Sequence, residues 1–258
     1  MDPVVRHLDL FSGIGGFALA CRMVGGIETV AFCEREPYCQ KVLAKHWPSV
    51  PICPDIHDLK GTEYGTVELI TGGYPCQPFS TAGERRGEND DRHLWSEVRR
   101  IVETARPRWC LFENVAGHIT LGLDQVLSDL DSIGYTAGAT VLPACAVGAG
   151  HRRDRVWIVA NAKCGDAQEF RVCEGEVREE GAEASDGLVH GFDFGMGWNI
   201  ESRILRGGDG VSAKVDGSKR VKALGNAIVP QVAAEIIRAM MLADRLANPR
   251  REAEETRT

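Results

Sequence analysis

Short apolar runs alternate with amphipathic stretches over residues 6–160, and this alternation limits the possible folds more than any other feature. The runs resemble strands, whereas the stretches between them repeat apolar residues with a helical period. The predicted strands are residues 6–11, 29–33, 68–71, 109–112, 139–142 and 155–160, and the predicted helices are residues 16–24, 38–46, 94–105, 123–133 and 229–241. Strands that alternate with helices predict an α/β fold with a doubly wound, mostly parallel sheet.

The alternation stops at Asn161. Residues 163–219 are rich in glycine, glutamate and aspartate and show no clean period, and regularity returns with a helix that starts near Pro230. We therefore predict a core made of residues 1–162 and 220–247, a small insertion of residues 163–219, and a solvated tail of residues 248–258.

Composition narrows the class of protein. Hydrophobic residues make up 43% and charged residues 26% of the chain, as in ordinary soluble proteins, and neither a membrane span nor a signal peptide is expected. The net charge of −7 argues against a general polyanion binder, although a local basic face can still bind nucleic acid. The nine cysteines form no CxxC pair, so we expect reduced cytosolic thiols and no metal site.

One cysteine stands apart from the others. Cys76 lies in the glycine- and proline-rich turn of residues 72–80, directly after an apolar run at residues 67–70. α/β enzymes place reacting groups at the carboxyl ends of buried strands. Glu113 follows another such run, and residues 151–155 form a basic cluster. A nucleophile, an acid and cations together suit chemistry on an electron-rich ring.

A glycine-rich turn joins the first predicted strand to the first helix at residues 9–17. Its glycines allow a ligand close to the backbone, and the helix start offers free amides, although a turn that binds nothing fits the same residues. Glu34 ends the second strand and suits ribose hydroxyls, and Asp55 with Ile56 suits an adenine. Taken singly these acids also fit a solvated surface, but together they favour a nucleoside cofactor without pyrophosphate, such as S-adenosylmethionine.

Five motifs occur in the order found in the DNA cytosine-5 methyltransferase family, which the chain resembles over nearly its whole length apart from the stretch after Asn161 and the tail. They are residues 11–17 (Phe-Ser-Gly-Ile-Gly-Gly-Phe), 75–80 (Pro-Cys-Gln-Pro-Phe-Ser), 113–115 (Glu-Asn-Val), 151–155 (His-Arg-Arg-Asp-Arg) and 225–230 (Gly-Asn-Ala-Ile-Val-Pro). The resemblance implies a Rossmann-like methyltransferase fold in which residues 163–219 form a short target-recognition region.

The resemblance also implies the reaction and its residues. Cys76 would add to carbon 6 of cytosine, Glu113 would bind ring nitrogen 3 and the exocyclic amine, and Arg155 with Arg153 beside it would steady the carbonyl and the thiolate. S-adenosylmethionine would leave as S-adenosylhomocysteine. The implied cofactor-binding residues are Phe11, Ser12, Gly13, Ile14, Gly16, Glu34, Asp55, Ile56, Pro75 and Asn226.

The implied partner is double-stranded DNA with its target cytosine flipped out of the stack. Residues 81–92 are similar to the family's mobile catalytic loop, and an acidic insertion this small predicts a short or degenerate target site. The expected DNA contacts are Ser80, Arg85, Arg86, Arg92, Arg203 and Arg206. We further expect a cytoplasmic, prokaryotic or phage-encoded monomer, with a cognate restriction endonuclease as a possible partner.

Two residues depart from the family pattern. His151 stands where glutamine is usual, and His93 where glycine is common. Three other readings stay open: a tRNA cytosine-5 methyltransferase, a core that needs a partner to choose its sites, and a non-catalytic DNA-binding homologue. The last class typically loses the cysteine or the cofactor glycines, and this chain has both.

Overall fold

The computed structural model describes residues 4–75, 94–163 and 217–247. The chain divides into two compact units, of which the first comprises residues 1–163 and 213–258 and the second residues 164–212. The second unit lies outside the described residues. The predicted target-recognition region and the predicted tail therefore stay predictions.

Within the described residues, seven strands form one sheet in the order β3-β2-β1-β4-β5-β7-β6. The strands are β1 (Val5–Leu10), β2 (Ile27–Cys33), β3 (Ile52–Cys53), β4 (Leu69–Gly72), β5 (Trp109–Val115), β6 (Tyr135–Pro143) and β7 (Asp154–Ala162). Strands β3, β2, β1, β4 and β5 run parallel, and β7 pairs antiparallel with both β5 and β6. The doubly wound, mostly parallel sheet is confirmed.

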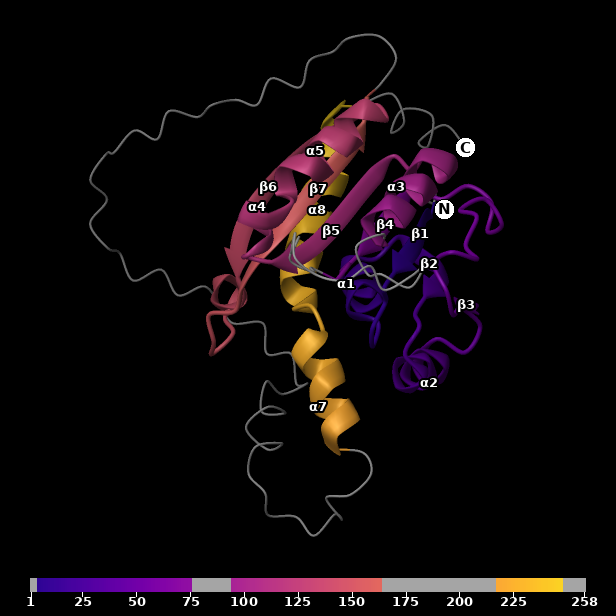
Figure 1. Cartoon of the computed structure of the whole chain (residues 1–258), viewed down its shortest axis with the longest axis vertical. Helices are drawn as coiled ribbons and strands as arrows, with labels where there is room; N and C mark the ends of the chain where they lie inside the picture. Colours follow the sequence, from indigo (N-terminus) through magenta and orange to yellow (C-terminus); the bar gives the residue numbers. More distant parts are fainter. Residues whose placement is uncertain (1–3, 76–93, 164–216, 248–258) are drawn as a thin grey trace, which may run out of the picture. The chain divides into compact units, whose positions relative to one another are not determined.

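Helices cover both faces of this sheet (Figure 1). They are α1 (Gly16–Val24), α2 (Pro37–His46), α3 (Leu94–Ala105), α4 (His118–Leu121), α5 (Leu123–Ser132), α7 (Gly217–Asn226) and α8 (Pro230–Ala247), and residues Ala144–Val147 form a 3₁₀ turn. Neighbouring strand residues point to opposite faces, so Ile70 packs with α3 and α5 whereas Leu69 packs with α1 and α8. Burial on both sides explains why the central strands are apolar throughout.

Three differences from the predicted elements have physical causes. β3 was not among the predicted strands, because its two residues lie between Pro51 and Pro54 and offer no period to detect. β6 begins four residues earlier than its predicted range of 139–142, because it is an edge strand with mostly exposed side chains. Helix α7 was also missed, and its first residues fall in the stretch that showed no clean period.

Helix α8 closes the core from the far end of the sequence. Residues 223–246 are long and apolar enough to cross a bilayer by composition alone, with a mean hydropathy of 1.2. In the folded chain, however, Val232, Ala233 and Ile237 are buried in the cluster that also contains Phe17 of α1. Of that apolar window, 28% is buried within the fold.

Candidate active site

The candidate site lies at the carboxyl edge of the parallel strands. Chain connections from β1 and β4 lead to opposite sides of the sheet, and ligands bind at such a switch point in doubly wound folds. The turn of residues 11–16 follows β1, and Gly73, Tyr74 and Pro75 follow β4. The topology thus places the predicted cofactor turn beside the segment that leads to Cys76.

The glycine-rich turn is fixed by bonds beneath it and open above. Phe11, Gly13 and Gly15 have positive φ values of 51°, 54° and 87°. The Ser12 hydroxyl donates to the Asp9 carbonyl at 2.7 Å, which anchors the turn to β1. A Cβ on Gly13 would meet no described atom within 4 Å, whereas one on Gly15 would lie 2.6 Å from the Trp47 ring. The turn therefore combines tight packing at Gly15 with free space at Gly13, as a ligand cradle requires.

Glu34 follows β2 and faces this turn. Its Oε2 accepts the Gly13 amide at 2.6 Å, and its Oε1 accepts the Glu36 amide at 2.7 Å. A carboxylate oxygen has two lone pairs, so each oxygen can still accept a hydroxyl. The position fits the predicted role with ribose, and the bond to Gly13 adds a structural role that the sequence did not reveal.

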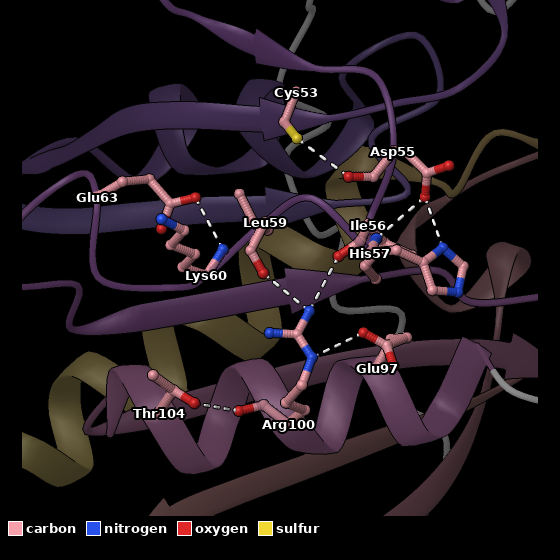
Figure 2. A network of polar contacts seen from close by, with 10 residues as sticks. All are labelled: Cys53, Asp55, Ile56, His57, Leu59, Lys60, Glu63, Glu97, Arg100 and Thr104. Atoms are coloured by element: carbon pink, nitrogen blue, oxygen red, sulfur yellow. Dashed lines mark hydrogen bonds and ion pairs between the residues drawn. The ribbon is translucent and has the colours of Figure 1, made fainter.

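Arg100 ties the loop after β3 to helix α3 (Figure 2). Its Nη2 donates to the carbonyls of Ile56 at 3.1 Å and Leu59 at 2.8 Å, and its Nε pairs with Glu97 at 2.7 Å. Because both carbonyls belong to one loop, this arginine helps to fix where the residues after β3 lie. No signal in the sequence marked Arg100 for this role.

Asp55 and Ile56 occupy different environments within that loop. One oxygen of the Asp55 carboxylate forms hydrogen bonds with the His57 backbone amide at 3.0 Å and with the His57 ring nitrogen at 2.7 Å (Figure 2). The hydrogen bond from the backbone amide is the main cause that lowers the pKa of Asp55. Ile56 is only 4% exposed and belongs to the core. Its main contacts are therefore with protein, and its packing against an adenine stays a prediction.

The residues before Cys76 are held from three elements. The Tyr74 carbonyl accepts the Asn114 side-chain amide at 3.1 Å, and the Tyr74 hydroxyl bonds to Nε2 of His118 at 2.7 Å. Its ring lies 5.2 Å from the ring of Trp95 at the start of α3, measured between centroids. Tyr74, Asn114 and His118 were not assigned from the sequence, because only the folded chain brings them together.

Several predicted site residues lie outside the described part of the chain. Pro75 is the last described residue of its segment and is exposed. The predicted nucleophile and DNA contacts that fall beyond it or in the second unit are Cys76, Ser80, Arg85, Arg86, Arg92, Arg203 and Arg206. His93 is also outside, and the predictions for all these residues stay predictions.

Glu113 and Arg155 form an ion pair on adjacent strands. Arg155 Nε lies 2.9 Å from Glu113 Oε1, and Glu113 is 8% exposed. Burial raises the pKa of Glu113, and the guanidinium groups of Arg155 and Arg153 only partly offset this rise. A Cβ on Gly73 would lie 3.5 Å from Glu113 Oε2, so the acid lies next to the segment that leads to Cys76. The fold thus brings the predicted acid and one predicted cation together.

Arg153 and Asn226 lie near the carboxyl end of α7. Arg153 Nη2 donates to the carbonyls of Gly225 and Ala227, both at 2.8 Å. Asn226 is exposed at the last residue of the helix. Over the described ranges, 4–75, 94–163 and 217–247, no group of three His, Cys, Asp or Glu could hold a metal ion.

A buried polar chain lies below the cofactor turn. His7 Nε2 bonds to the Thr71 hydroxyl at 2.8 Å, and that hydroxyl donates to Asp9 Oδ1 at 2.9 Å. Burial lowers the pKa of His7 to about 3. Burial raises the pKa of Asp9 to about 8, and nearby Glu34 adds to the rise, although bonds from Thr71 and the Ala18 amide oppose it. Asp9 is therefore expected to be protonated in the fold at neutral pH.

This shift predicts a pH-dependent stability. An aspartate in the unfolded chain loses its proton near its ordinary pKa of 3.8, whereas folded Asp9 holds it to about 8. The free energy of unfolding should therefore fall by about 1.4 kcal/mol per pH unit between these limits. We expect Asp9→Asn to remove this loss, so that the fall in melting temperature from pH 5 to pH 8.5 is smaller in the variant than in the wild type. Thermal denaturation checks this, with exposed Asp58→Asn as the control, and equal pH dependence in Asp9→Asn and wild type would contradict it.

Comparison with protein families matches residues 5–190 to the C-5 cytosine-specific DNA methylase family. The chain belongs to this family. The type II methyltransferase M.HgiBI of Herpetosiphon aurantiacus is 35% identical to this methylase-family chain over 160 residues, which are 60% of this chain and 36% of the relative. M.AluI of Cellulosimicrobium cellulans is 31% identical over 252 residues, which are 81% of this chain and 47% of the relative.

The chain thus spans less than half the length of these two relatives. A solved structure of DNMT2 from Spodoptera frugiperda resembles the C-5 methylase fold of this chain with a TM-score of 0.57 and 23% identity, over 65% of this chain and 53% of that one. At this identity the likeness supports the fold alone.

Proposed function

We propose that this protein transfers a methyl group from S-adenosylmethionine to carbon 5 of a cytosine in duplex DNA. The pair of buried Glu113 with half-buried Arg155 carries the proposal, because Glu113 lies beside Gly73 in the segment that continues to Cys76. An acid and a cation next to a chain segment that carries a thiol suit addition to a pyrimidine ring.

The residues around the glycine-rich turn fit the proposed methyl donor. Gly13 has free space beside it, the oxygens of Glu34 have lone pairs left to accept ribose hydroxyls, and Asn226 and Pro75 are exposed. We propose that Phe11, Ser12, Gly13, Ile14 and Gly16 hold the donor with Glu34, and that Asp55 and Ile56 lie toward its adenine. When bound, S-adenosylmethionine supplies an electrophilic methyl group.

The chain's own residues make carbon 5 of cytosine reactive. The Cys76 thiolate forms a bond to carbon 6, and the ring electrons move so that carbon 5 becomes nucleophilic. Glu113 donates to ring nitrogen 3 and accepts from the exocyclic amine, and Arg155 donates to the ring carbonyl. After carbon 5 gains the methyl group, a base removes its proton and the bond between Cys76 and carbon 6 breaks, which restores the ring.

The substrate in this proposal is a duplex from which the cytosine is flipped. Ser80, Arg85, Arg86 and Arg92 contact the DNA near the catalytic cysteine, and Arg203 and Arg206 contact it from residues 163–219. Because this region is short, we propose a short or degenerate target site. The named relatives are type II methyltransferases, so a cognate restriction endonuclease is a proposed partner of this cytoplasmic monomer.

Bisulfite sequencing of plasmid DNA from expressing cells tests the function. We expect 5-methylcytosine at one short recurring sequence in cells with the wild-type protein and none in cells with Cys76→Ala. Methyl incorporation into tRNA but not into duplex DNA would contradict the proposed substrate. A soluble protein that binds S-adenosylhomocysteine but methylates neither would contradict independent activity and indicate a missing partner.

A further inference from the structure

Arg153 connects the start of β7 to a segment more than seventy residues away in the sequence. The residue lies just before β7 with a φ of 39°, and its Nη2 donates to the carbonyls of Gly225 and Ala227, each at 2.8 Å. One nitrogen therefore joins two carbonyls on either side of the end of α7. We call residues 225–228 the cover segment.

The two carbonyls are groups that need a donor. The last carbonyls of an α-helix have no partner within the helix, and a cation at this end also interacts favourably with the helix dipole. Gly225 belongs to the last turn of α7, and Ala227 follows the helix directly. The Arg153 guanidinium therefore caps α7 and fixes the direction in which the chain leaves it.

Ile228 of the cover segment packs against two glycines at the candidate site. Ile228 packs so closely on Gly16 that a Cβ there would lie 2.6 Å from Ile228 Cγ1. A Cβ on Gly73 would lie 4.0 Å from Ile228 Cγ2. Ile228 thus touches both the end of the glycine-rich turn and the segment that leads to Cys76, so the position of the cover segment affects both.

Arg155, two residues further along the chain, contacts a different part of the site. Arg155 pairs with Glu113 at 2.9 Å, whereas Arg153 Nη2 donates to two carbonyls of the cover segment. The beginning of β7 therefore supports the acid through one guanidinium and the cover segment through the other.

We propose that Arg153 is a positioning residue, which keeps Ile228 seated on Gly16 and Gly73 by capping α7 and so preserves the shape of the methyl-donor site. The identity of the ligand rests on the function proposed above. Arg153 acts on the donor through the cover segment, and contact with the base falls to Arg155.

Matched substitutions separate these two roles. Arg153→Met and Arg155→Met each remove a guanidinium group, at positions two residues apart. Methionine at position 153 must adopt the same positive φ as arginine does, so this substitution does not alter the backbone strain there. We expect Arg153→Met to weaken S-adenosylhomocysteine binding, measured by titration calorimetry, by about 10- to 100-fold, because a charged donor to two carbonyls is lost. Arg155→Met should change this affinity by less than about threefold, since Arg155 pairs with Glu113 and not with the cover segment.

Two further readouts distinguish positioning from a general loss of structure. In methylation assays Arg153→Met should raise KM for the methyl donor more than it lowers kcat, and Arg155→Met should do the reverse. Arg153→Lys should restore most of the donor affinity, because an ammonium can also donate to two carbonyls. Loss of kcat with unchanged donor affinity in Arg153→Met would overturn the proposal and indicate direct contact with the base.

Hydrogen exchange tests, in the absence of any ligand, whether Arg153 caps the end of α7. The Ala227 amide donates to the Ala223 carbonyl at 3.0 Å, and we expect amides 223–228 to exchange faster in Arg153→Met but not in Arg155→Met. Wild-type exchange in Arg153→Met would overturn the cap. If wild-type protein did not bind S-adenosylhomocysteine, the proposed function would fail, while the exchange result would still decide whether Arg153 holds the cover segment.

Discussion

Replacing Cys76 by alanine is expected to lower the methylation rate by at least about 10³-fold, because carbon 5 then has no route to a nucleophilic state. The effect should appear in kcat, since the alanine leaves the cofactor turn and the Glu113–Arg155 pair in place. Single-turnover methylation of a duplex that carries the mapped target site measures it. A Cys76→Ala variant that retained a tenth of wild-type activity would contradict covalent catalysis by this residue.

A trapped adduct tests the same step without relying on a rate. In DNA with 5-fluorocytosine at the target, fluorine replaces the proton that must leave carbon 5 before the thiol is released. Wild-type protein should therefore stay attached to this DNA through denaturing electrophoresis, and Cys76→Ala should not. Cys145→Ala is the control, because Cys145 is an exposed thiol that lies far along the chain, in the 3₁₀ turn after β6.

Glu113→Gln is expected to lower kcat by about 10²- to 10⁴-fold. Glutamine keeps the size of the side chain and can still donate to ring nitrogen 3, but it cannot transfer a proton and loses the ion pair with Arg155. KM for the methyl donor should change little, because in the proposed mechanism Glu113 contacts the cytosine and not the methyl donor. Nearly wild-type kcat in Glu113→Gln would remove this residue from the reaction.

The pH dependence of the rate follows from the same residue. Burial raises the pKa of Glu113, and the protonated form is the one that donates to ring nitrogen 3. The wild-type kcat should therefore fall as the pH rises through this elevated pKa, whereas Glu113→Gln should lack that decline. Rate profiles of both proteins measured over the same pH range, with a mixed buffer of constant ionic strength, make the comparison.

The parts of the fold that could be predicted are those in which the pattern is local. Buried parallel strands need apolar residues on both faces, so β1, β4 and β5 were visible as runs such as residues 109–112. The amphipathic helices α1, α3 and α5 likewise show their period in a single stretch. The order of motifs then identified the family from the residues around Cys76 and Glu113.

The rest depends on contacts that no local pattern records. Tyr74 meets His118 across 44 positions, and Arg153 meets Gly225 across 72. Nothing in the sequence distinguishes the arginines of a basic cluster, so Arg153 and Arg155 were predicted to share one catalytic role. In the fold, Arg155 pairs with Glu113 of β5, and Arg153 donates to carbonyls at the end of α7. Short elements such as β3 are also lost, because two residues between prolines carry no period.

The contact between Tyr74 and Trp95 has a consequence for how this protein can vary. Tyr74 precedes the stretch that carries Cys76, and Trp95 follows it. The rings of Tyr74 and Trp95 are in contact, and Phe112 of β5 packs against both. Both ends of the intervening stretch are thus fastened to the same aromatic cluster, whatever its length. The entropy of closing a chain segment depends only weakly on its length, so the aromatic cluster can hold its two ends together over a range of lengths. The packing of the sheet is thereby separated from the stretch that carries Cys76 and the proposed DNA contacts, so substitutions in that stretch should change the proposed reaction without unfolding the core.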